Sequence, residues 1–209
     1  KLSHRVDGRA PTVQGNMPPG NAIGSGLQMI SGTAEDGDGS GVAEVAVERA
    51  ASVKGTLSWV AEVEFARIAE GEVLPVTLAV RASDGVGNRG EAVAVTFNVD
   101  AARPDPPVFT VPGTLRGGSA TVSGTARDVK PAGSRVARVE VQLDNEGNPW
   151  LPALALPEPG PDGVQAWTFA WALPTDDGKA HSLRARAIDV AGNVSAESPW
   201  QPVVVDNTG

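Results

Sequence analysis

The sequence predicts an all-β protein that consists of two tandem antiparallel β-sandwiches, and three observations support this fold class. First, one pattern of sequence blocks occurs twice within the 209 residues. Second, short runs alternate apolar and polar residues, which is the period of a half-buried strand. Third, 25 glycines and 17 prolines supply turn residues between such runs. We find no segment with the 3.6-residue apolar period that indicates a helix.

The repeat consists of three blocks that follow each other in the same order in both copies. Ser-Gly-Thr-Ala-x-Asp begins at Ser31 and again at Ser123, and a Val-Ala-x-Val-x-Val run follows each. The third block, Arg-Ala-x-Asp-x-x-Gly-Asn, ends at Asn88 and Asn193. The distance between equivalent residues grows from 92 to 105 along the chain. The second copy therefore carries an insertion, which we place at residues 144–165.

A Val-Asp pair ends each copy and also occurs near the start of the chain, at Val6-Asp7, Val99-Asp100 and Val205-Asp206. We interpret residues 1–8 as a tail or the end of a preceding repeat, residues 9–102 as the first domain and residues 103–209 as the second. Repeated domains contact their neighbours along the chain. We therefore expect the array to continue at both ends, with neighbouring repeats of the same chain or assembly as partners.

The alternating runs predict which side chains form the two cores. In residues 59–65, the large apolar side chains share one face and the glutamates share the other. In the second copy, residues 167–171 place their three aromatic side chains inward. Residues 138–143 direct Gln142 outward, together with the other polar side chains of that run. These positions predict half-buried strands of antiparallel sheets.

The block that ends in Gly-Asn lies between two predicted strands in both copies. Gly87 and Gly192 can adopt the positive φ that a short hairpin turn requires. Short strands separated by turn residues, without helices, are typical of the two-sheet immunoglobulin-like sandwich. Each copy is therefore predicted to be one immunoglobulin-like domain.

These motifs resemble the bacterial immunoglobulin-like repeats of large secreted and surface-anchored proteins. The resemblance rests on Ser-Gly-Thr-Ala-x-Asp, the Val-rich strand, the Gly-Asn turn and the terminal Val-Asp-Asn-Thr, and it covers nearly the whole chain. It implies an extracellular or cell-surface location and a structural or adhesive role as a stalk, spacer or filament subunit. The first copy departs from the pattern, because Ala101 follows its Val-Asp pair where the second copy has Asn207.

Composition excludes several functional classes. The net charge of −8, with only four lysines, argues against a nucleic-acid partner, since phosphate binding requires a basic face. The absence of cysteine excludes disulfides, thiol catalysis and cysteine zinc sites. No run of 18 apolar residues is present, so we expect no membrane insertion of this segment.

No catalytic constellation is recognisable in the sequence. The two histidines, His4 and His181, lie in different copies without the partners of a triad, and we interpret both as surface residues. Glu62 and Glu64 share one face of one strand, whereas glycosidase carboxylates flank a bond from two sides. We therefore expect that the chain is not an enzyme.

The aspartates near the predicted turns are candidate calcium ligands. In an immunoglobulin-like sandwich, the loop after the second strand and the last hairpin meet at the pole where the chain enters. The candidates are Asp7, Asp36, Asp38 and Asp84 in the first copy, and Asp100, Asp105, Asp128 and Asp189 for an interdomain site. Carboxylates and loop carbonyls supply the six to eight oxygens that Ca²⁺ binds. The alternative is turn chemistry, in which Asp bonds its own backbone.

The insertion of the second copy is a candidate binding loop for a glycan or a surface protein. Trp150, Leu151 and Leu154 would form an apolar surface on a proline-rich frame. Alternatively, Trp150 packs against the edge of the sandwich, as large apolar side chains usually do. The sequence also leaves open that the chain is an accessory domain of a secreted enzyme.

Overall fold

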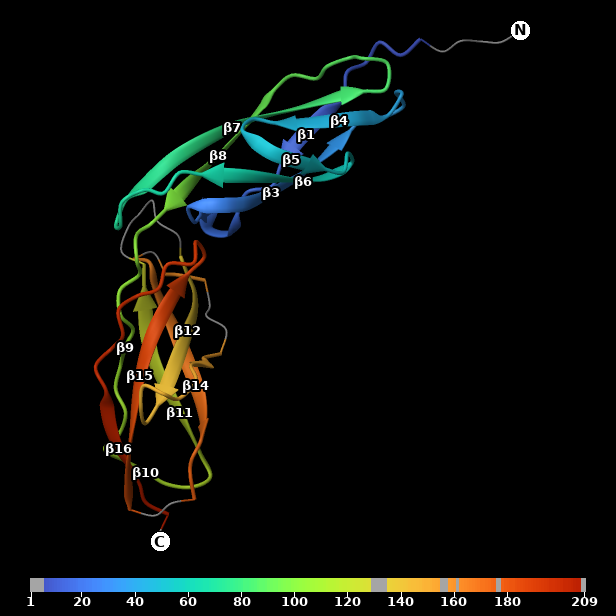
Figure 1. The fold of residues 1–209 in the computed structure, drawn as a ribbon. Helices are drawn as coiled ribbons and strands as arrows, with labels where there is room; N and C mark the ends of the chain where they lie inside the picture. Colours follow the sequence, from blue (N-terminus) through green and yellow to red (C-terminus); the bar gives the residue numbers. More distant parts are fainter. Residues whose placement is uncertain (1–5, 129–134, 155–157, 161, 176–177, 208–209) are drawn as a thin grey trace. The chain divides into compact units, whose positions relative to one another are not determined.

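The computed structural model describes residues 6–128, 135–154, 158–160, 162–175 and 178–207 (Figure 1). The chain divides into two units, Lys1–Asp100 and Ala101–Gly209, each with a hydrophobic core of its own. Within the described ranges, strands dominate and the 3-10 turn Pro19–Asn21 is the one helical element. No helix among these residues could cross a membrane. The predicted class, tandem immunoglobulin-like sandwiches, is confirmed.

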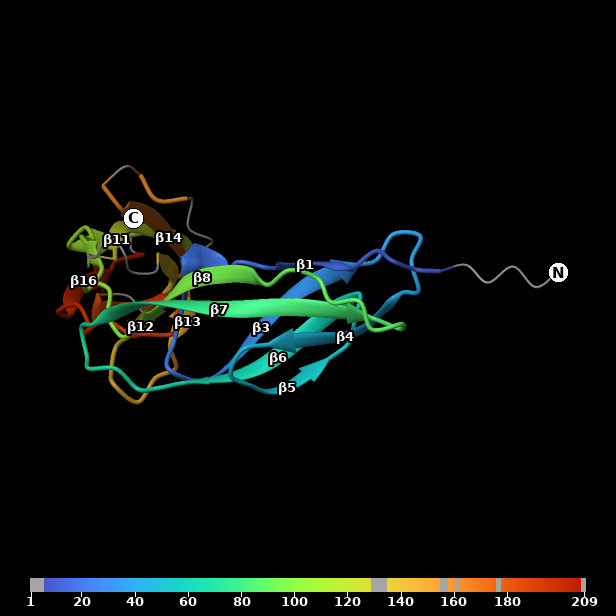
Figure 2. The same ribbon diagram turned by 90° about the horizontal axis from the view of Figure 1, so that it is seen from above.

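The first unit contains two four-stranded sheets, visible along their length in Figure 2. One sheet has the order β1 (Thr12–Gly15), β3 (Gly26–Glu35), β6 (Ser58–Phe65) and β5 (Ala50–Lys54). The other has the order β2 (Ala22–Ile23), β8 (Val93–Asp100), β7 (Val73–Asp84) and β4 (Val42–Val47). All neighbours are antiparallel except β2 and β8, which are parallel. The strand order is that of a constant-type immunoglobulin sandwich whose first strand is split between the sheets.

The second unit differs in the position of its fourth strand. Its smaller sheet has the order β14 (Val164–Ala172), β11 (Ser119–Arg127) and β9 (Val108–Phe109). Its larger sheet has the order β10 (Thr114–Leu115), β16 (Gln201–Val205), β15 (Lys179–Asp189), β12 (Val136–Leu143) and β13 (Leu151–Pro152). β13 pairs with β12, whereas its counterpart β5 pairs with β6 in the other sheet. The fourth strand has thus changed sheets between the two copies.

The cores consist of the side chains that the alternation predicts to point inward. Trp59 and Phe65 of β6 are 0% and 1% exposed, and Phe65 meets Phe97 edge to face at 5.7 Å between ring centroids. In the second unit, Trp167 is 1% exposed and meets Phe109 in the same way at 5.5 Å. Burial of such aromatic side chains supplies much of the driving force for folding.

The glycine of each Ser-Gly-Thr-Ala motif lies beneath the core tryptophan of its unit. A Cβ atom at Gly32 would meet the Trp59 ring, with Cε2 at 2.6 Å. A Cβ atom at Gly124 would lie 2.6 Å from Phe109 Cβ and 2.8 Å from Trp167 Cζ2. Any side chain would therefore displace the tryptophan or the neighbouring strand, and this close approach explains why the motif contains glycine at this position.

The predicted hairpin turns are also confirmed. Gly87 and Gly192 have φ values of 95° and 92°. In each turn, the backbone N–H of the glycine donates to the carbonyl of the preceding aspartate, Asp84 or Asp189. The turns therefore place these two aspartates at the ends of β7 and β15.

Candidate metal centres

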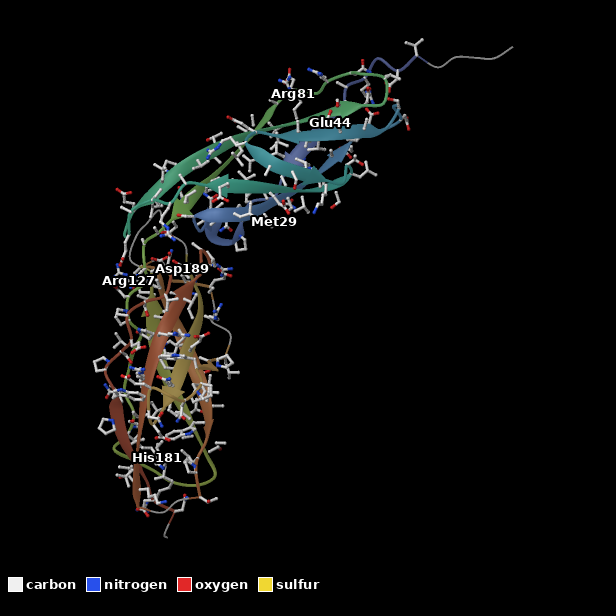
Figure 3. All side chains as sticks on the ribbon, in the orientation of Figure 1. Met29, Glu44, Arg81, Arg127, His181 and Asp189 are labelled. Carbon is white, nitrogen blue, oxygen red and sulfur yellow. The ribbon has the colours of Figure 1, made fainter. Side chains whose placement is uncertain are left out.

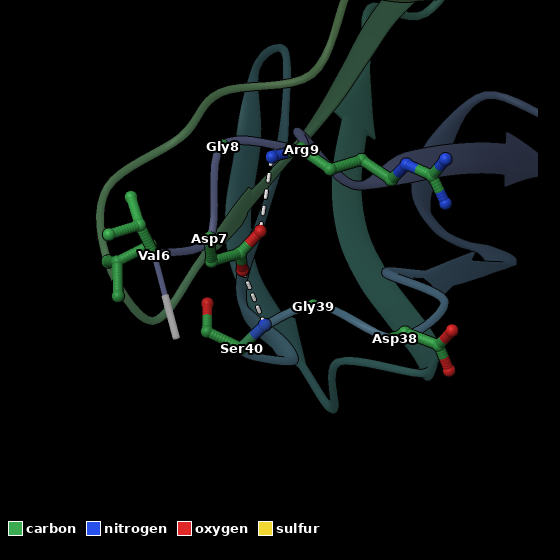
Figure 4. A pocket seen from close by; sticks show the side chains of 8 residues that line it. Val6, Asp7, Gly8, Arg9, Asp38, Gly39 and Ser40 are labelled. Carbon is green, nitrogen blue, oxygen red and sulfur yellow. Dashed lines mark hydrogen bonds between the residues drawn. The ribbon is translucent and has the colours of Figure 1, made fainter. Parts of the chain in front are cut away.

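An acidic cluster lies at one pole of the first unit, where three segments of the chain meet. One carboxylate oxygen from each of Asp7, Asp36 and Asp84 lies within 4.8 Å of the others. Asp7 precedes β1, Asp36 follows β3, and Asp84 is the last residue of β7. The structure thus brings together three of the four aspartates predicted here. Asp38 is exposed and outside the cluster, and its carboxylate points away from Asp7 (Figure 4).

Hydrogen bonds from the backbone hold Asp7 and Asp36 in place. The Asp7 carboxylate accepts the N–H of Arg9 at 3.1 Å and of Ser40 at 2.5 Å (Figure 4). Asp36 Oδ2 accepts the Gly41 N–H at 2.7 Å, but its Oδ1 is buried without a hydrogen-bond partner. Asp36 is only 6% exposed. Gly39 leaves the space that this carboxyl occupies, because a Cβ there would lie 2.6 Å from Asp36 Cγ.

Asp84 organises the turn that follows β7. Its Oδ1 accepts the N–H groups of Val86 and Asn88, and its Oδ2 accepts Asn88 Nδ2 at 2.7 Å. Burial by itself would raise the pKa of Asp84, but the hydrogen bonds from Asn88, Val86 and Gly87 outweigh it and hold the pKa below its ordinary value of 3.8. Asp84 is therefore an anion at neutral pH.

Asn88 joins this turn to the segment through which the chain enters the unit. Its Nδ2 also donates to the carbonyl oxygens of Asp7 at 3.2 Å and Arg9 at 3.3 Å. The turn chemistry and the convergence of carboxylates, considered as alternatives from the sequence, therefore occur together. Beside the cluster lies a cavity of about 490 Å³, whose walls include Asp7, Ser40 and Val86 (Figure 4).

The second unit repeats the turn around Asp189, which lies at one end of that unit (Figure 3). Its two carboxylate oxygens accept the N–H of Asn193 at 2.7 Å and Asn193 Nδ2 at 2.9 Å. A carboxylate oxygen of Asp128 lies within 4.8 Å of one of Asp189. Asp105 is outside this group and donates its backbone N–H to the Arg127 carbonyl. Asp100 is buried as the last residue of β8, and the interdomain calcium site stays a prediction.

The insertion of the second unit packs on the outer face of its larger sheet. Gln142, predicted to point into solvent, does lie on that face but is only 1% exposed, so its predicted exposure is wrong. The insertion covers it, and Gln142 Nε2 donates to the carbonyl oxygens of Glu146 at 3.1 Å and Asn148 at 2.5 Å. Leu151 is half-buried against the core, and Leu154 is 60% exposed. A ligand-binding role of Trp150, Leu151 and Leu154 stays a prediction.

Trp150 belongs to a stack of aromatic and guanidinium groups on this face. Arg184 lies over the rings of Trp200 and Trp150, at 4.6 and 5.4 Å from their centroids, and Arg186 lies 4.2 Å from the Trp150 centroid. Arg184 also donates to Gln142 Oε1 at 2.8 Å. This cluster is not among the sites predicted from the sequence. Its signal is that both arginines occupy outward positions of one strand in the copy that has the insertion.

Glu140 pairs with two arginines beside this stack. Burial alone would raise its pKa, but the hydrogen bonds and charges of Arg138 and Arg186 outweigh it, so the pKa lies below its ordinary value of 4.5. A carboxyl group with a depressed folded-state pKa stabilises the fold above its unfolded-state pKa, and this contribution is lost as pH falls through the folded-state value. The melting temperature of the second unit should therefore decline as pH falls below about 4.5.

Glu140→Gln is expected to make that acid-induced decline shallower, because the variant has no carboxyl group to protonate at this position. Differential scanning calorimetry from neutral to acidic pH measures the effect. Glu158→Gln is the matched control, since the Glu158 side chain also pairs with one arginine but is 81% exposed. Equal pH profiles for both variants would contradict the role assigned to Glu140.

His181 is not the surface residue that the sequence predicts, because its side chain is 10% exposed. Its Nδ1 lies 3.0 Å from Asp144 Oδ1, and its ring meets Trp171 edge to face. Figure 3 shows it at the end of the second unit opposite Asp189. His181 therefore fixes the start of the insertion to β15. His4 lies outside the described residues.

No protein-family model and no curated protein matches the chain. Among solved structures, the chain is similar to fibronectin(III)-like modules of Clostridium thermocellum CbhA, with 17% identity, 94% of each chain covered and a TM-score of 0.48. It is similar to the sialic acid binding region of a Streptococcus sanguinis adhesin, with 13% identity, 97% of this chain and 78% of that chain covered, and a TM-score of 0.29. It is also similar to the Yersinia pseudotuberculosis adhesin InvE, with 14% identity, 95% of this chain and 60% of that chain covered, and a TM-score of 0.31.

Proposed function

We propose that this chain is a non-catalytic structural module of a repetitive bacterial surface protein, in which each unit transmits tension as part of a stalk, spacer or filament. The observation that carries the proposal is the pairing of strands near the two ends of each unit. β2 is parallel to β8 in the first unit, and β10 is parallel to β16 in the second. Both units thus join an early strand to their last strand.

Parallel pairing gives these strands a mechanical role. When the ends of a unit are pulled apart, parallel neighbours slide along each other, so their hydrogen bonds are loaded together rather than opened in sequence. In the second unit, Val204 N–H donates to the Gly113 carbonyl and Asp206 N–H to the Leu115 carbonyl, both at 2.9 Å. The side chains of Arg116 and Asp206 add an ion pair at 2.9 Å. The β10–β16 contact is therefore the expected point of resistance.

Val204→Pro is expected to lower the force at which the second unit unfolds, because proline has no N–H to donate to Gly113. Ala153→Pro is the matched control. It removes one N–H···O bond of the same 2.9 Å length, to the Val139 carbonyl, at the residue that follows the edge strand β13. Each variant loses a hydrogen bond worth about 0.5–1.5 kcal/mol at equilibrium.

Single-molecule stretching of the whole chain between its ends measures the effect, with one force peak expected for each unit. One peak should drop in Val204→Pro, and both should stay near their original force in Ala153→Pro. Equal drops in the two variants would show that the unfolding force follows overall stability, and the mechanical role of the parallel pair would be refuted.

The proposal includes an extracellular or cell-surface location and neighbouring repeats as partners. It is supported by the repetition of the same motifs in two units, each of which has its own core and contains no disulfide. The insertion of the second unit is a second candidate surface, for a glycan or a surface protein, because it contains Leu154, which is 60% exposed, and the half-buried Trp150.

A further inference from the structure

The acidic cluster of the first unit contains a buried carboxylate oxygen that accepts no hydrogen bond from the surrounding turns. Both carboxylate oxygens of Asp7 and of Asp84 accept hydrogen bonds. Asp36 is 6% exposed, and its Oδ1 has no hydrogen-bond partner. A buried carboxylate oxygen without a donor is costly, and proteins normally pair such groups or use them to bind a metal.

The same cluster gathers negative charge in a small volume. The three carboxylates lie within 4.8 Å of one another, so each repels the other two. Within the described part of the chain, no Arg, Lys or His side chain forms an ion pair with Asp36 or Asp84. The Arg9 guanidinium extends away from the Asp7 carboxylate (Figure 4). A bound cation would offset this repulsion and provide the missing partner for Asp36.

We propose that Asp7, Asp36 and Asp84 bind one Ca²⁺ ion. Hard oxygen ligands favour Ca²⁺ or Mg²⁺ over transition metals. Ca²⁺ binds oxygen at about 2.3–2.6 Å, so two ligands of one ion lie at most about 5 Å apart. The three carboxylate oxygens lie within 4.8 Å of one another, so one ion can contact all three. The flexible coordination of Ca²⁺ suits ligands from three separate segments better than the near-ideal, largely hydrated octahedron that Mg²⁺ requires. Backbone carbonyls and water complete the six to eight ligands.

The ion would connect three segments that are distant in sequence: the entry of the chain, the loop after β3 and the end of β7. Asp7 lines the cavity of about 490 Å³, so the cluster adjoins this cavity through Asp7, whereas Asp36 and Asp84 are buried. Calcium would thereby fix the residues that precede β1 onto the first unit. This site goes beyond the mechanical role and stands whether or not the unit carries tension.

Asp36→Asn in the whole chain tests the proposal. The asparagine side-chain oxygen can still accept the Gly41 N–H, so the loop keeps its hydrogen bond while one charge and one strong ligand are removed. Asp38→Asn is the matched control, because it removes one charge from the same loop at an exposed residue outside the cluster. Isothermal titration with CaCl₂ after chelator treatment counts the bound ions, and calorimetry follows the melting of the first unit.

The original chain should bind Ca²⁺, and a hundredfold excess over Kd should raise the melting temperature of the first unit by roughly 10 °C. Asp36→Asn should lose one binding event and this shift, Asp38→Asn should keep both, and in chelator Asp36→Asn should melt no lower than the original chain. The absence of binding at millimolar Ca²⁺, or equal losses in the two variants, would overturn the site. A lower melting temperature of Asp36→Asn in chelator would assign Asp36 to turn structure and also overturn it.

Discussion

Gly124→Ala is expected to destabilise the second unit by about 3 kcal/mol, the upper part of the range for overpacked cores. The added methyl group would lie 2.6 Å from Phe109 Cβ and 2.8 Å from Trp167 Cζ2. Neither neighbour can move aside easily, because Phe109 and Trp167 are 7% and 1% exposed. Gly32→Ala should have the same effect on the first unit, where Trp59 occupies the equivalent place.

Denaturant unfolding followed by tryptophan fluorescence measures the loss, and calorimetry assigns it to one of the two units. Gly118→Ala is the control, because no atom lies within 4 Å of its added Cβ and its φ is not in the left-handed region. That substitution should change stability by less than about 1 kcal/mol and can increase it through the unfolded state. If Gly124→Ala were as mild as Gly118→Ala, the tryptophan would not be closely packed on the glycine.

The fold could be predicted from the sequence because its main signals are local. The two-residue alternation of residues 59–65 is enough to assign Trp59 and Phe65 to the core, since a strand turns successive side chains to opposite faces. The positive φ of Gly87 likewise follows from the turn that it occupies. Repetition of these local patterns then indicates two domains without any knowledge of long-range contacts.

The pairing of the fourth strand could not be predicted in this way. β13 has only two residues, Leu151 and Pro152, and it pairs with β12, whereas the backbone N–H of Leu154 donates to β14. A strand of two residues is too short to show an alternating pattern. The path of the insertion determines which of the two sheets it joins. The same path buries Gln142, whose polar character and alternation indicate solvent exposure.

The acidic cluster was predictable to the extent that topology determines it. Asp36 follows β3 and Asp84 ends β7, and both strands end at the same pole, so their convergence with Asp7 needs only the strand order. Asp38 depends on the loop itself, in which Gly37 and Gly41 have φ values of 54° and 89°. These two glycines, in the left-handed region, determine the direction in which the Asp38 side chain between them points. The presence of an aspartate in the loop does not predict that direction.

Arg184→Ala is expected to lower the free energy of unfolding of the second unit by about 2–4 kcal/mol. Its side chain is only 9% exposed, forms an ion pair with Glu197, and lies 4.6 Å from the Trp200 ring centroid. Truncation removes these contacts and leaves the buried Gln142 Oε1 without the donor that lies at 2.8 Å. The loss of that donor adds the cost of an unsatisfied buried acceptor.

Two further variants separate charge from stacking in this cluster. Arg184→Lys keeps the positive charge but lacks the planar guanidinium that lies on Trp200 and Trp150, so it should retain most of the destabilisation. Arg138→Ala should cost less than about 1 kcal/mol, because the Arg138 side chain is 58% exposed in its ion pair with Glu140. Chemical denaturation of the whole chain measures all three. Full stability of Arg184→Lys would mean that charge alone holds the insertion, whereas persistent loss assigns that role to the stacked guanidinium.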